Sequence, residues 1–322
     1  MQIFFYEAFE EEADALRQAL PGEFKAGFTW MTPQEAGHRS PPARLVSIRT
    51  QSHIPPHWAH ALDGILSRST GFDHLTRLLA RFETPVLCAH LPLYCHRAVA
   101  EQALLLWMAL LRKLPRQTAQ MTRFQRDSLT GQECAGKTLF VVGVGHIGSE
   151  IVKIGQALGM RVLGHDKIHK HDFVDYTDLE SALAVADIVV CAMNLTDENN
   201  GYFDRHVLAK TKPGSLFINI ARGELAPTAD VLALLESGHL GGVGLDVFED
   251  EGAIAVAWRE GRKTAASQTL RALKDHPRAI CTPHNAFNTI EAVRRKSEHS
   301  VLQIRHFLDH GRWLWPIPTQ SK

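Results

Sequence analysis

The chain of 322 residues has no long apolar run and no excess of charge of either sign. Its most apolar stretch, Ala103–Leu111, is far shorter than the ~20 residues that a helix needs to cross a bilayer. Basic and acidic residues number 35 each. The chain therefore has no excess positive charge that would attract nucleic acid or an anionic membrane. The sequence therefore predicts neither a nucleic-acid partner nor a membrane partner.

Cysteine is also scarce, with five residues that are scattered along the chain and form no Cys-x-x-Cys pair. This pattern argues against a disulfide framework and against structural zinc. The opening segment, Met1–Tyr6, lacks the basic region and cleavage site of a signal peptide and runs straight into acidic residues. We therefore expect a cytoplasmic protein, long enough for two domains with sizeable cores.

One glycine-rich stretch, Gly143-Val-Gly-His-Ile-Gly148, follows the apolar run Thr138–Val142 and precedes a helical pattern over 149–158. A buried strand, a tight glycine turn and a helix N-terminus form the arrangement that holds the pyrophosphate of a dinucleotide. The first glycine permits the sharp turn, the second lets the backbone approach the phosphates, and the third lets the helix pack closely. The expected cofactor residues of this turn are Gly143, Gly145, His146, Ile147 and Gly148, with His146 contributing its backbone.

A second apolar run, Arg161–Asp166, ends in a carboxylate about twenty residues after the glycines. An acidic residue at this place binds the hydroxyls of the adenosine ribose. Because Asp166 would repel a 2′-phosphate, the sequence favours NAD over NADP as cofactor. The neighbouring Lys167 acts in the opposite direction.

Strand and helix patterns alternate along the whole chain, which predicts an α/β fold with doubly wound parallel sheets. We expect two Rossmann-like or flavodoxin-like domains, with a discontinuous substrate domain from residues 1–97 and 288–322. Residues 98–287 would form the NAD-binding domain. The passages Arg116–Gly136 and Gly252–Gln268 are expected to be loops, and the second of these could shape specificity.

Three further stretches place reactive side chains at strand ends, where ligands bind in doubly wound folds. They are Asn219-Ile-Ala-Arg-Gly-Glu-Leu225, Gly244-Leu-Asp-Val-Phe-Glu-Asp-Glu251 and Thr282-Pro-His-Asn-Ala-Phe287. With the glycine turn and Asp166, these stretches resemble, in order, the motifs of the D-isomer-specific 2-hydroxyacid dehydrogenase family. Arg68–His74 and Tyr94–Glu101 resemble the substrate loop and the start of the interdomain helix of that family.

The resemblance implies roles for a catalytic triad. Arg222 would bind the substrate carboxylate through its guanidinium fork, which fits planar carboxylates. His284 would be the general acid in reduction and the general base in oxidation, and Glu251 would support its imidazolium. Glu249 and Asp250 compete with Glu251 for this role, but matching to the family selects Glu251.

The resemblance also implies ligand contacts and an assembly. Thr70, Gly71 and Tyr94 would join Arg222 around a small 2-oxo or 2-hydroxy acid. Asp246 would contact the nicotinamide carboxamide, and the remaining residues along the NAD would be Met193, Asn194, Asn199 and Ala221. The helix predicted over 98–114 would contribute to a homodimer, and closure of the domains would exclude water.

Several alternatives remain open at this point. Glyoxylate or hydroxypyruvate reduction and phosphoglycerate oxidation use the same scaffold, and C-terminal-binding-protein corepressors use it as an NAD-sensing interaction module. Formate dehydrogenase relatives usually carry glutamine where Glu251 stands. His165, His169 and His171 lie close together with two aspartates, but the segment is a polar loop and we expect no metal. The sequence thus predicts NAD-dependent interconversion of a 2-oxo acid and a D-2-hydroxy acid.

Overall fold

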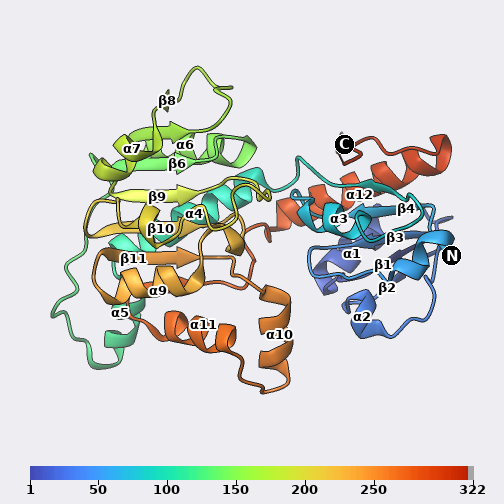
Figure 1. The fold of residues 1–322 in the computed structure, drawn as a ribbon, viewed down its shortest axis with the longest axis horizontal. Coiled ribbons are helices and arrows are strands. Elements are labelled where there is room, and N and C mark those ends of the chain that lie inside the picture. The colour runs from blue at the N-terminus through green and yellow to red at the C-terminus, as the bar shows by residue number, and fades with distance from the viewer. Residues whose placement is uncertain (318–322) are drawn as a thin grey trace. The chain divides into compact units, whose positions relative to one another are not determined.

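The computed structural model describes residues 1–317 and divides into two compact units. One comprises residues 1–95 together with the chain from Asn288, and the other comprises residues 96–287. The first boundary lies two residues before the domain boundary predicted from the sequence. Each unit is an α/β structure around a parallel sheet, as predicted (Figure 1).

The smaller unit contains a five-stranded parallel sheet in the order β2-β1-β3-β4-β5. Its strands are β1 (Ile3–Phe5), β2 (Ala26–Phe28), β3 (Leu45–Ile48), β4 (Gly64–Ser67) and β5 (Leu87–Ala89). Its helices are α1 (Glu10–Ala19), α2 (Pro33–Ala36), α3 (Asp73–Leu79) and α12 (Ile290–His310), with a 3₁₀ turn at Pro56–Ala61. Helices α1 and α12 pack against each other, so the C-terminal helix completes this unit (Figure 1).

The larger unit contains a seven-stranded parallel sheet in the order β12-β11-β10-β9-β6-β7-β8. Its strands are β6 (Thr138–Val142), β7 (Arg161–His165), β8 (Asp175–Tyr176), β9 (Ile188–Cys191), β10 (Ser215–Asn219), β11 (Leu240–Leu245) and β12 (Ala279–Cys281). The strand order reverses at β6, which pairs with β7 on one side and β9 on the other. Ligands bind in doubly wound sheets at the carboxyl ends of strands beside such a reversal.

The helices of the larger unit include a long one at its start. They are α4 (His96–Leu111), α5 (Leu114–Gln120), α6 (His146–Ala157), α7 (Leu179–Val185), α8 (Arg205–Leu208), α9 (Thr228–Glu236), α10 (Glu251–Arg259) and α11 (Ala265–Asp275), with 3₁₀ turns at Met121–Arg123 and Gly223–Leu225. Helix α4 contacts β10, β11 and β12 as well as α6. Its buried alanines, valine, leucines and tryptophan join the apolar interior of this unit.

Two passages expected to be loops are partly helical. Within Arg116–Gly136, α5 extends to Gln120 and a 3₁₀ turn follows; Pro115 stands in the first turn of α5, where proline is favoured. Within Gly252–Gln268, α10 continues to Arg259, and α11 begins under a capping box formed by Thr264 and Ser267. The prediction of a long specificity loop at 252–268 was therefore wrong, because alanine-rich sequence and a capping pair favour helices there.

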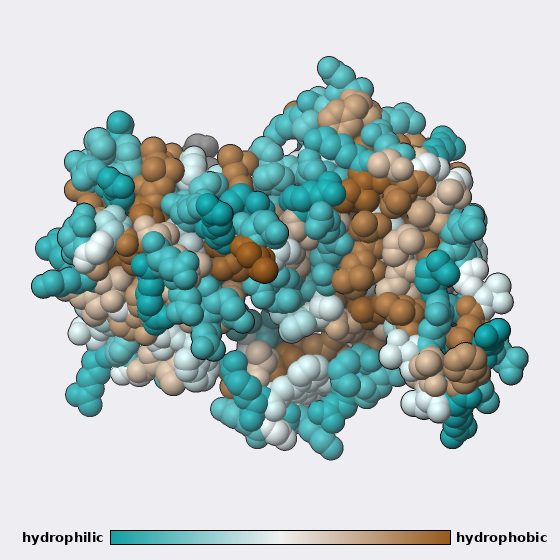
Figure 2. Space-filling view, turned by 180° about the vertical axis from the view of Figure 1, so that it is seen from behind, coloured by the Kyte–Doolittle hydropathy of each residue, from teal (hydrophilic) through white to brown (hydrophobic). Residues whose placement is uncertain are grey.

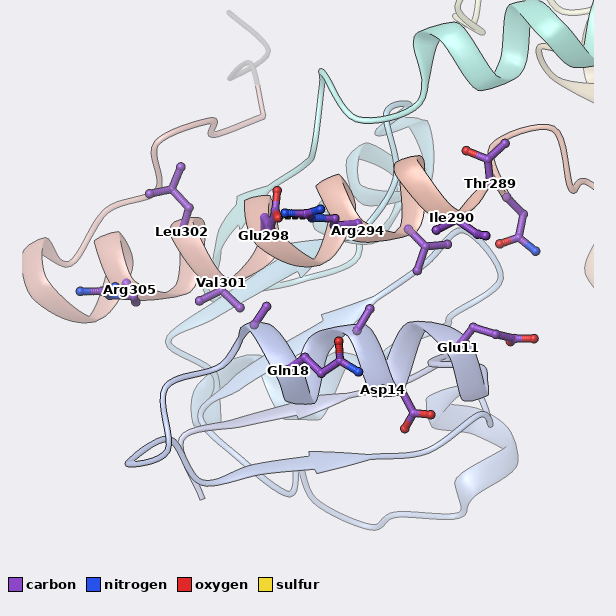
Figure 3. A pocket seen from close by; sticks show the side chains of 14 residues that line it. Glu11, Asp14, Gln18, Thr289, Ile290, Arg294, Glu298, Val301, Leu302 and Arg305 are labelled. Atoms are coloured by element: carbon purple, nitrogen blue, oxygen red, sulfur yellow. Dashed lines mark hydrogen bonds and ion pairs between the residues drawn. The ribbon is translucent and has the colours of Figure 1, made fainter.

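A groove with a volume of about 960 Å³ lies within the smaller unit, between α1 and α12. Figure 3 shows acidic and amide side chains of α1, including Glu11, Asp14 and Gln18, opposite side chains of α12. None of the site residues predicted from the sequence lines this groove. Among the described residues, no helix is both long and apolar enough to cross a membrane.

Candidate active site

The glycine turn after β6 has the geometry that its sequence predicts. Gly143 has a φ of +90°, and a Cβ there would lie 2.5 Å from the Cα of Met193. A Cβ on Gly148 would lie 2.0 Å from the carbonyl oxygen of Gly143, so only glycine allows α6 to start so close to the turn. Gly145 precedes α6 directly, and a Cβ there would meet nothing within 4 Å. The turn thus leaves open space in front of a helix N-terminus, where a phosphate group fits.

The helix after this turn begins earlier than the sequence pattern indicated. Helix α6 starts at His146, not at Ser149, so His146 and Ile147 are its first two residues. Their backbone N–H groups belong to the first turn, which has no partners within the helix. The side chain of His146 is exposed, and its ring centroid lies 6.3 Å from that of His96.

Asp166 follows β7 and reaches back to the glycine turn. Its Oδ2 accepts a hydrogen bond of 2.7 Å from the backbone N–H of Val144, and its Oδ1 accepts one of 3.0 Å from Ile168. The carboxylate therefore lies at the carboxyl end of β7, directly beside the turn that would hold the pyrophosphate. This is the place where a ribose-binding carboxylate is expected.

The loop after β9 forms the other side of the glycine turn. Asn199 braces this loop, since its Oδ1 accepts from the Thr196 N–H at 2.7 Å and its Nδ2 donates to the Asn194 carbonyl at 2.8 Å. Met193 packs against Gly143. Met193, Asn194 and Asn199 thus lie on one loop next to the turn.

Arg222 stands at the end of β10, held by a residue that sequence reasoning did not single out. Asn219 accepts a hydrogen bond from the Ala221 N–H at 3.1 Å and donates one to the Arg222 carbonyl at 2.9 Å. The guanidinium Nη1 of Arg222 donates to the Ala221 carbonyl at 2.8 Å. The signal for Asn219 was available, since it opens the quoted motif and ends a buried strand.

The glycine after Arg222 brings two site segments into contact. A Cβ on Gly223 would lie 1.9 Å from the carbonyl carbon of Phe248, so the two backbones touch. Phe248 in turn donates its N–H to Oε1 of Glu251 at 2.9 Å. The strand-end arginine and the acidic stretch after β11 are therefore held together by direct backbone packing.

A hydrogen bond of 2.8 Å joins Nδ1 of His284 to Oε2 of Glu251. Their side chains are 24% and 20% exposed, so the pair is only partly open to solvent and Nε2 of His284 is the nitrogen that Glu251 does not engage. His284 has a φ of +49°, an uncommon value for a residue other than glycine. The nearby Glu249 has a different partner, because its Oε2 accepts from the N–H of Thr228 at the start of α9.

The strained turn at His284 is held by Asp246, which is fully buried. The carboxylate of Asp246 accepts hydrogen bonds from the N–H groups of Asn285 and Ala286 and from the hydroxyl of Thr282. Burial raises the pKa of Asp246, and these hydrogen bonds oppose that shift. The structure thus places Asp246 beneath the His284 turn, and its contact with nicotinamide stays a prediction.

The three remaining predicted residues lie in the smaller unit. Thr70 and Gly71 follow β4, where Thr70 Oγ1 lies 3.4 Å from the sulfur of Cys95 and the Gly71 carbonyl accepts from Ser69. Tyr94 is buried, and its hydroxyl donates to the Arg68 carbonyl at 3.5 Å. These residues belong to the smaller unit, whereas the eleven cofactor residues and the triad belong to the larger unit.

The histidines near Asp166 contact different partners. His165 bonds to the Thr177 carbonyl at 3.0 Å, and His169 stacks on Tyr176 with ring centroids 4.1 Å apart. Among residues 1–317, no group of three or more histidine, cysteine or acidic side chains is arranged to hold a metal ion.

Comparison with known proteins identifies this arrangement. Residues 104–286 match the family model for the NAD-binding domain of D-isomer-specific 2-hydroxyacid dehydrogenases. The chain is 32% identical over 245 residues to a D-lactate dehydrogenase of Streptococcus agalactiae serotype V, covering 74% of this chain and 73% of that protein. It is 33% identical over 241 residues to 2-hydroxyacid dehydrogenase A of Aspergillus oryzae, covering 73% and 69%.

A solved structure has the same fold over nearly the full length. The D-lactate dehydrogenase of Aquifex aeolicus, determined with NAD and lactic acid, superposes with a TM-score of 0.84 at 26% identity. The match covers 97% of this chain and 99% of that one. The chain therefore belongs to the D-isomer-specific 2-hydroxyacid dehydrogenases and is an NAD-dependent oxidoreductase of that family.

Proposed function

We propose that the protein interconverts a small 2-oxo acid and the corresponding D-2-hydroxy acid, with Arg222, Glu251 and His284 as its catalytic residues. The observation that carries this proposal is the 2.8 Å pair between His284 and Glu251 beside the Arg222 segment. NAD, when bound, supplies the hydride acceptor or donor at its nicotinamide ring. The residues of the chain then have to bind the acid, orient it and move one proton.

In this proposal His284 is the residue that transfers the proton to or from the C2 oxygen of the substrate. Because Glu251 Oε2 accepts from Nδ1, the imidazole is fixed in orientation, and Nε2 is left to exchange a proton with the C2 oxygen of the substrate. In reduction Nε2–H donates that proton, and in oxidation the neutral Nε2 accepts it. The Glu251 carboxylate stabilises the charged imidazolium that forms in oxidation.

Arg222 binds the substrate carboxylate in this proposal. A guanidinium offers paired N–H donors that match the two oxygens of a carboxylate, and it polarises the adjacent C2 carbonyl. We place the backbone N–H groups of Thr70 and Gly71, with Tyr94, at the same carboxylate, and the residues around the glycine turn along the NAD. In this proposal Asp166 binds the adenosine ribose. The remaining cofactor contacts come from Met193, Asn194, Asn199, Ala221 and Asp246.

The substrate is expected to carry a small or branched apolar group at C3. This expectation rests on the sequence around Phe287, which resembles D-lactate and branched 2-oxo acid members of the family. Phe287 is buried, and its ring centroid lies 6.5 Å from that of His284, so an apolar ring stands near the reacting centre.

Oxidation of NADH with pyruvate, glyoxylate, hydroxypyruvate, phenylpyruvate and branched 2-oxo acids tests the proposal. We expect the highest kcat/KM with pyruvate or a branched 2-oxo acid. Phosphoglycerate oxidation as the best reaction would contradict the substrate assignment. Absence of turnover, together with NADH-dependent capture of a peptide, would instead indicate an NAD-sensing interaction module.

We also propose a homodimer in the cytoplasm. The helices at the start of the larger unit and the turn after them expose the apolar side chains of Leu105, Leu114, Met121 and Phe124. Figure 2 shows apolar side chains gathered on one face of the larger unit. All five cysteines are free thiols, which fits a reducing compartment. Light scattering after size-exclusion chromatography tests the assembly, and a mass near 36 kDa would exclude the dimer.

A further inference from the structure

A salt bridge joins the two loops that flank the glycine turn. Lys167, directly after Asp166, lies 3.0 Å from Oε2 of Glu198, which projects from the loop after β9. The strands β7 and β9 stand on opposite sides of β6, so this ion pair bridges the carboxyl end of β6. That edge of the sheet is the place where the adenosine half of a dinucleotide binds in doubly wound folds.

The loop that presents Glu198 is held in place. Asn199 bonds to both Thr196 and Asn194, which closes the loop on itself. The segment after β9 therefore presents the Glu198 carboxylate to Lys167 from a loop with internal hydrogen bonds.

The positive charge of Lys167 would favour binding of NADP over NAD. NADP differs from NAD by a 2′-phosphate on the adenosine ribose, and an ammonium group next to the ribose-binding residue would attract that phosphate. In this chain the charge of Lys167 is matched by Glu198, and Asp166 adds a second carboxylate on the same side.

We propose that Glu198 is a specificity-determining residue for NAD over NADP, acting by neutralising Lys167. Glu198 holds the ammonium in an ion pair, so Lys167 is not available to attract a 2′-phosphate. This inference rests on the placement of the adenosine beside Asp166 in the proposed function.

Binding titrations with a set of charge variants test the inference without relying on turnover. We expect Glu198→Gln to tighten NADPH binding about three- to tenfold and to change NADH binding less than about twofold, as suits one exposed pair. The titration follows the fluorescence of the bound dihydronicotinamide. Asp275→Asn is the matched control, because Asp275 is also an exposed partner of a lysine but ends α11, just before the amino end of β12. It should change neither affinity.

The double variant Lys167→Ala, Glu198→Gln distinguishes a gain that comes from the freed lysine from a gain that comes only from the loss of the Glu198 charge. If the freed lysine binds the phosphate, the double variant loses most of the NADPH affinity gained by Glu198→Gln. An unchanged NADPH affinity in Glu198→Gln would overturn the inference, and so would a gain that survives the loss of Lys167. A wild-type protein that binds neither NADH nor NADPH would contradict the cofactor site itself, which is a different outcome.

Discussion

His284 and Glu251 stand 33 positions apart in the chain, and one hydrogen bond of 2.8 Å joins His284 Nδ1 to Glu251 Oε2. The histidine comes from the turn after β12, and the glutamate is the first residue of α10. Each is anchored separately, since Asp246 holds the His284 turn and the Phe248 N–H binds the other oxygen of Glu251. Two independently fixed groups need no reorganisation to support proton transfer.

Replacing His284 should abolish turnover while leaving the cofactor site intact. We expect His284→Ala to lower kcat about 10²- to 10⁴-fold, the range that a positioned acid–base group contributes. NADH affinity, followed by fluorescence, should change little, because the glycine turn lies at another strand. His310→Ala is a suitable control, since His310 is exposed near the end of α12. Substantial turnover in His284→Ala would exclude it as the proton donor.

The two glutamates of the acidic stretch should respond differently. Glu251→Gln removes the charge that supports the His284 imidazolium, and we expect kcat to fall at least about tenfold. Glu249→Gln keeps an acceptor for the Thr228 N–H, so activity should remain near that of the wild type. Steady-state kinetics on both variants measure the difference. Equal losses would indicate that the stretch acts through its folding and not through Glu251.

Arg222 should affect substrate binding and catalysis together. Arg222→Lys keeps a positive charge but loses the fork that matches a carboxylate, and we expect kcat/KM to fall by about 2–4 kcal/mol of transition-state binding. Both KM and kcat should change, because the carboxylate contact and the polarised carbonyl are lost together. The thermal midpoint serves as the check on folding. A lower midpoint with unchanged kinetics would make Arg222 a structural residue.

Asp166 should also control the choice between NADH and NADPH. Asp166→Ala removes the carboxylate that would repel a 2′-phosphate, so the preference for NADH over NADPH should fall about tenfold or more. The variant also removes the acceptor for the Val144 N–H, so NADH binding itself should weaken. The ratio of kcat/KM for the two cofactors measures the effect, and an unchanged ratio would remove the ribose role.

The buried charge cluster of the smaller unit should make stability depend on pH. Glu12, Arg68 and Lys296 are all fully buried, and both cations lie 2.8 Å from Oε1 of Glu12. Burial lowers the pKa of Lys296 to about 7, against the attraction of Glu12. Burial raises the pKa of Glu12, but Arg68 and Lys296 outweigh it and hold that pKa at about 2. The glutamate therefore stays charged at neutral pH.

The low pKa of Lys296 in the folded chain makes the free energy of unfolding depend on pH. Between pH 7 and about pH 10 the unfolded chain holds a proton on Lys296 that the folded chain has released, so stability rises with pH in this window. Lys296→Met should remove that rise, worth on the order of 1–2 kcal/mol between pH 7 and pH 9, and should leave the Glu12–Arg68 pair intact. Glu12→Ala should instead cost about 3–5 kcal/mol, because it leaves two buried cations without their carboxylate. Urea unfolding at several pH values measures both variants. An identical pH slope in Lys296→Met and the wild type would contradict this account.

The sequence determined much of the larger unit by itself. The run Thr138–Val142 and the glycines after it admit one local structure, because a β-branched strand, a residue with positive φ and a close helix start leave little choice. Alternation of strand and helix then predicted parallel sheets, which both units have. The apolar runs Thr138–Val142 and Arg161–Asp166 match β6 and β7 to within one residue, since buried parallel strands are continuous apolar runs.

Other features depended on contacts between distant segments. The family motif selected Glu251 over Glu249, but the partners of the two glutamates, His284 for Glu251 and the Thr228 N–H for Glu249, are visible only in the folded chain. The burial of Asp246 and the ion pair between Lys167 and Glu198 likewise join residues 31 to 40 positions apart. Helices α10 and α11 were missed although alanine-rich sequence and the capping pair of Thr264 and Ser267 favour helices there. The sequence thus determined which strands, turns and reactive groups exist, and the tertiary structure decided which of those groups meet, because side-chain partners depend on how the strand ends are brought together.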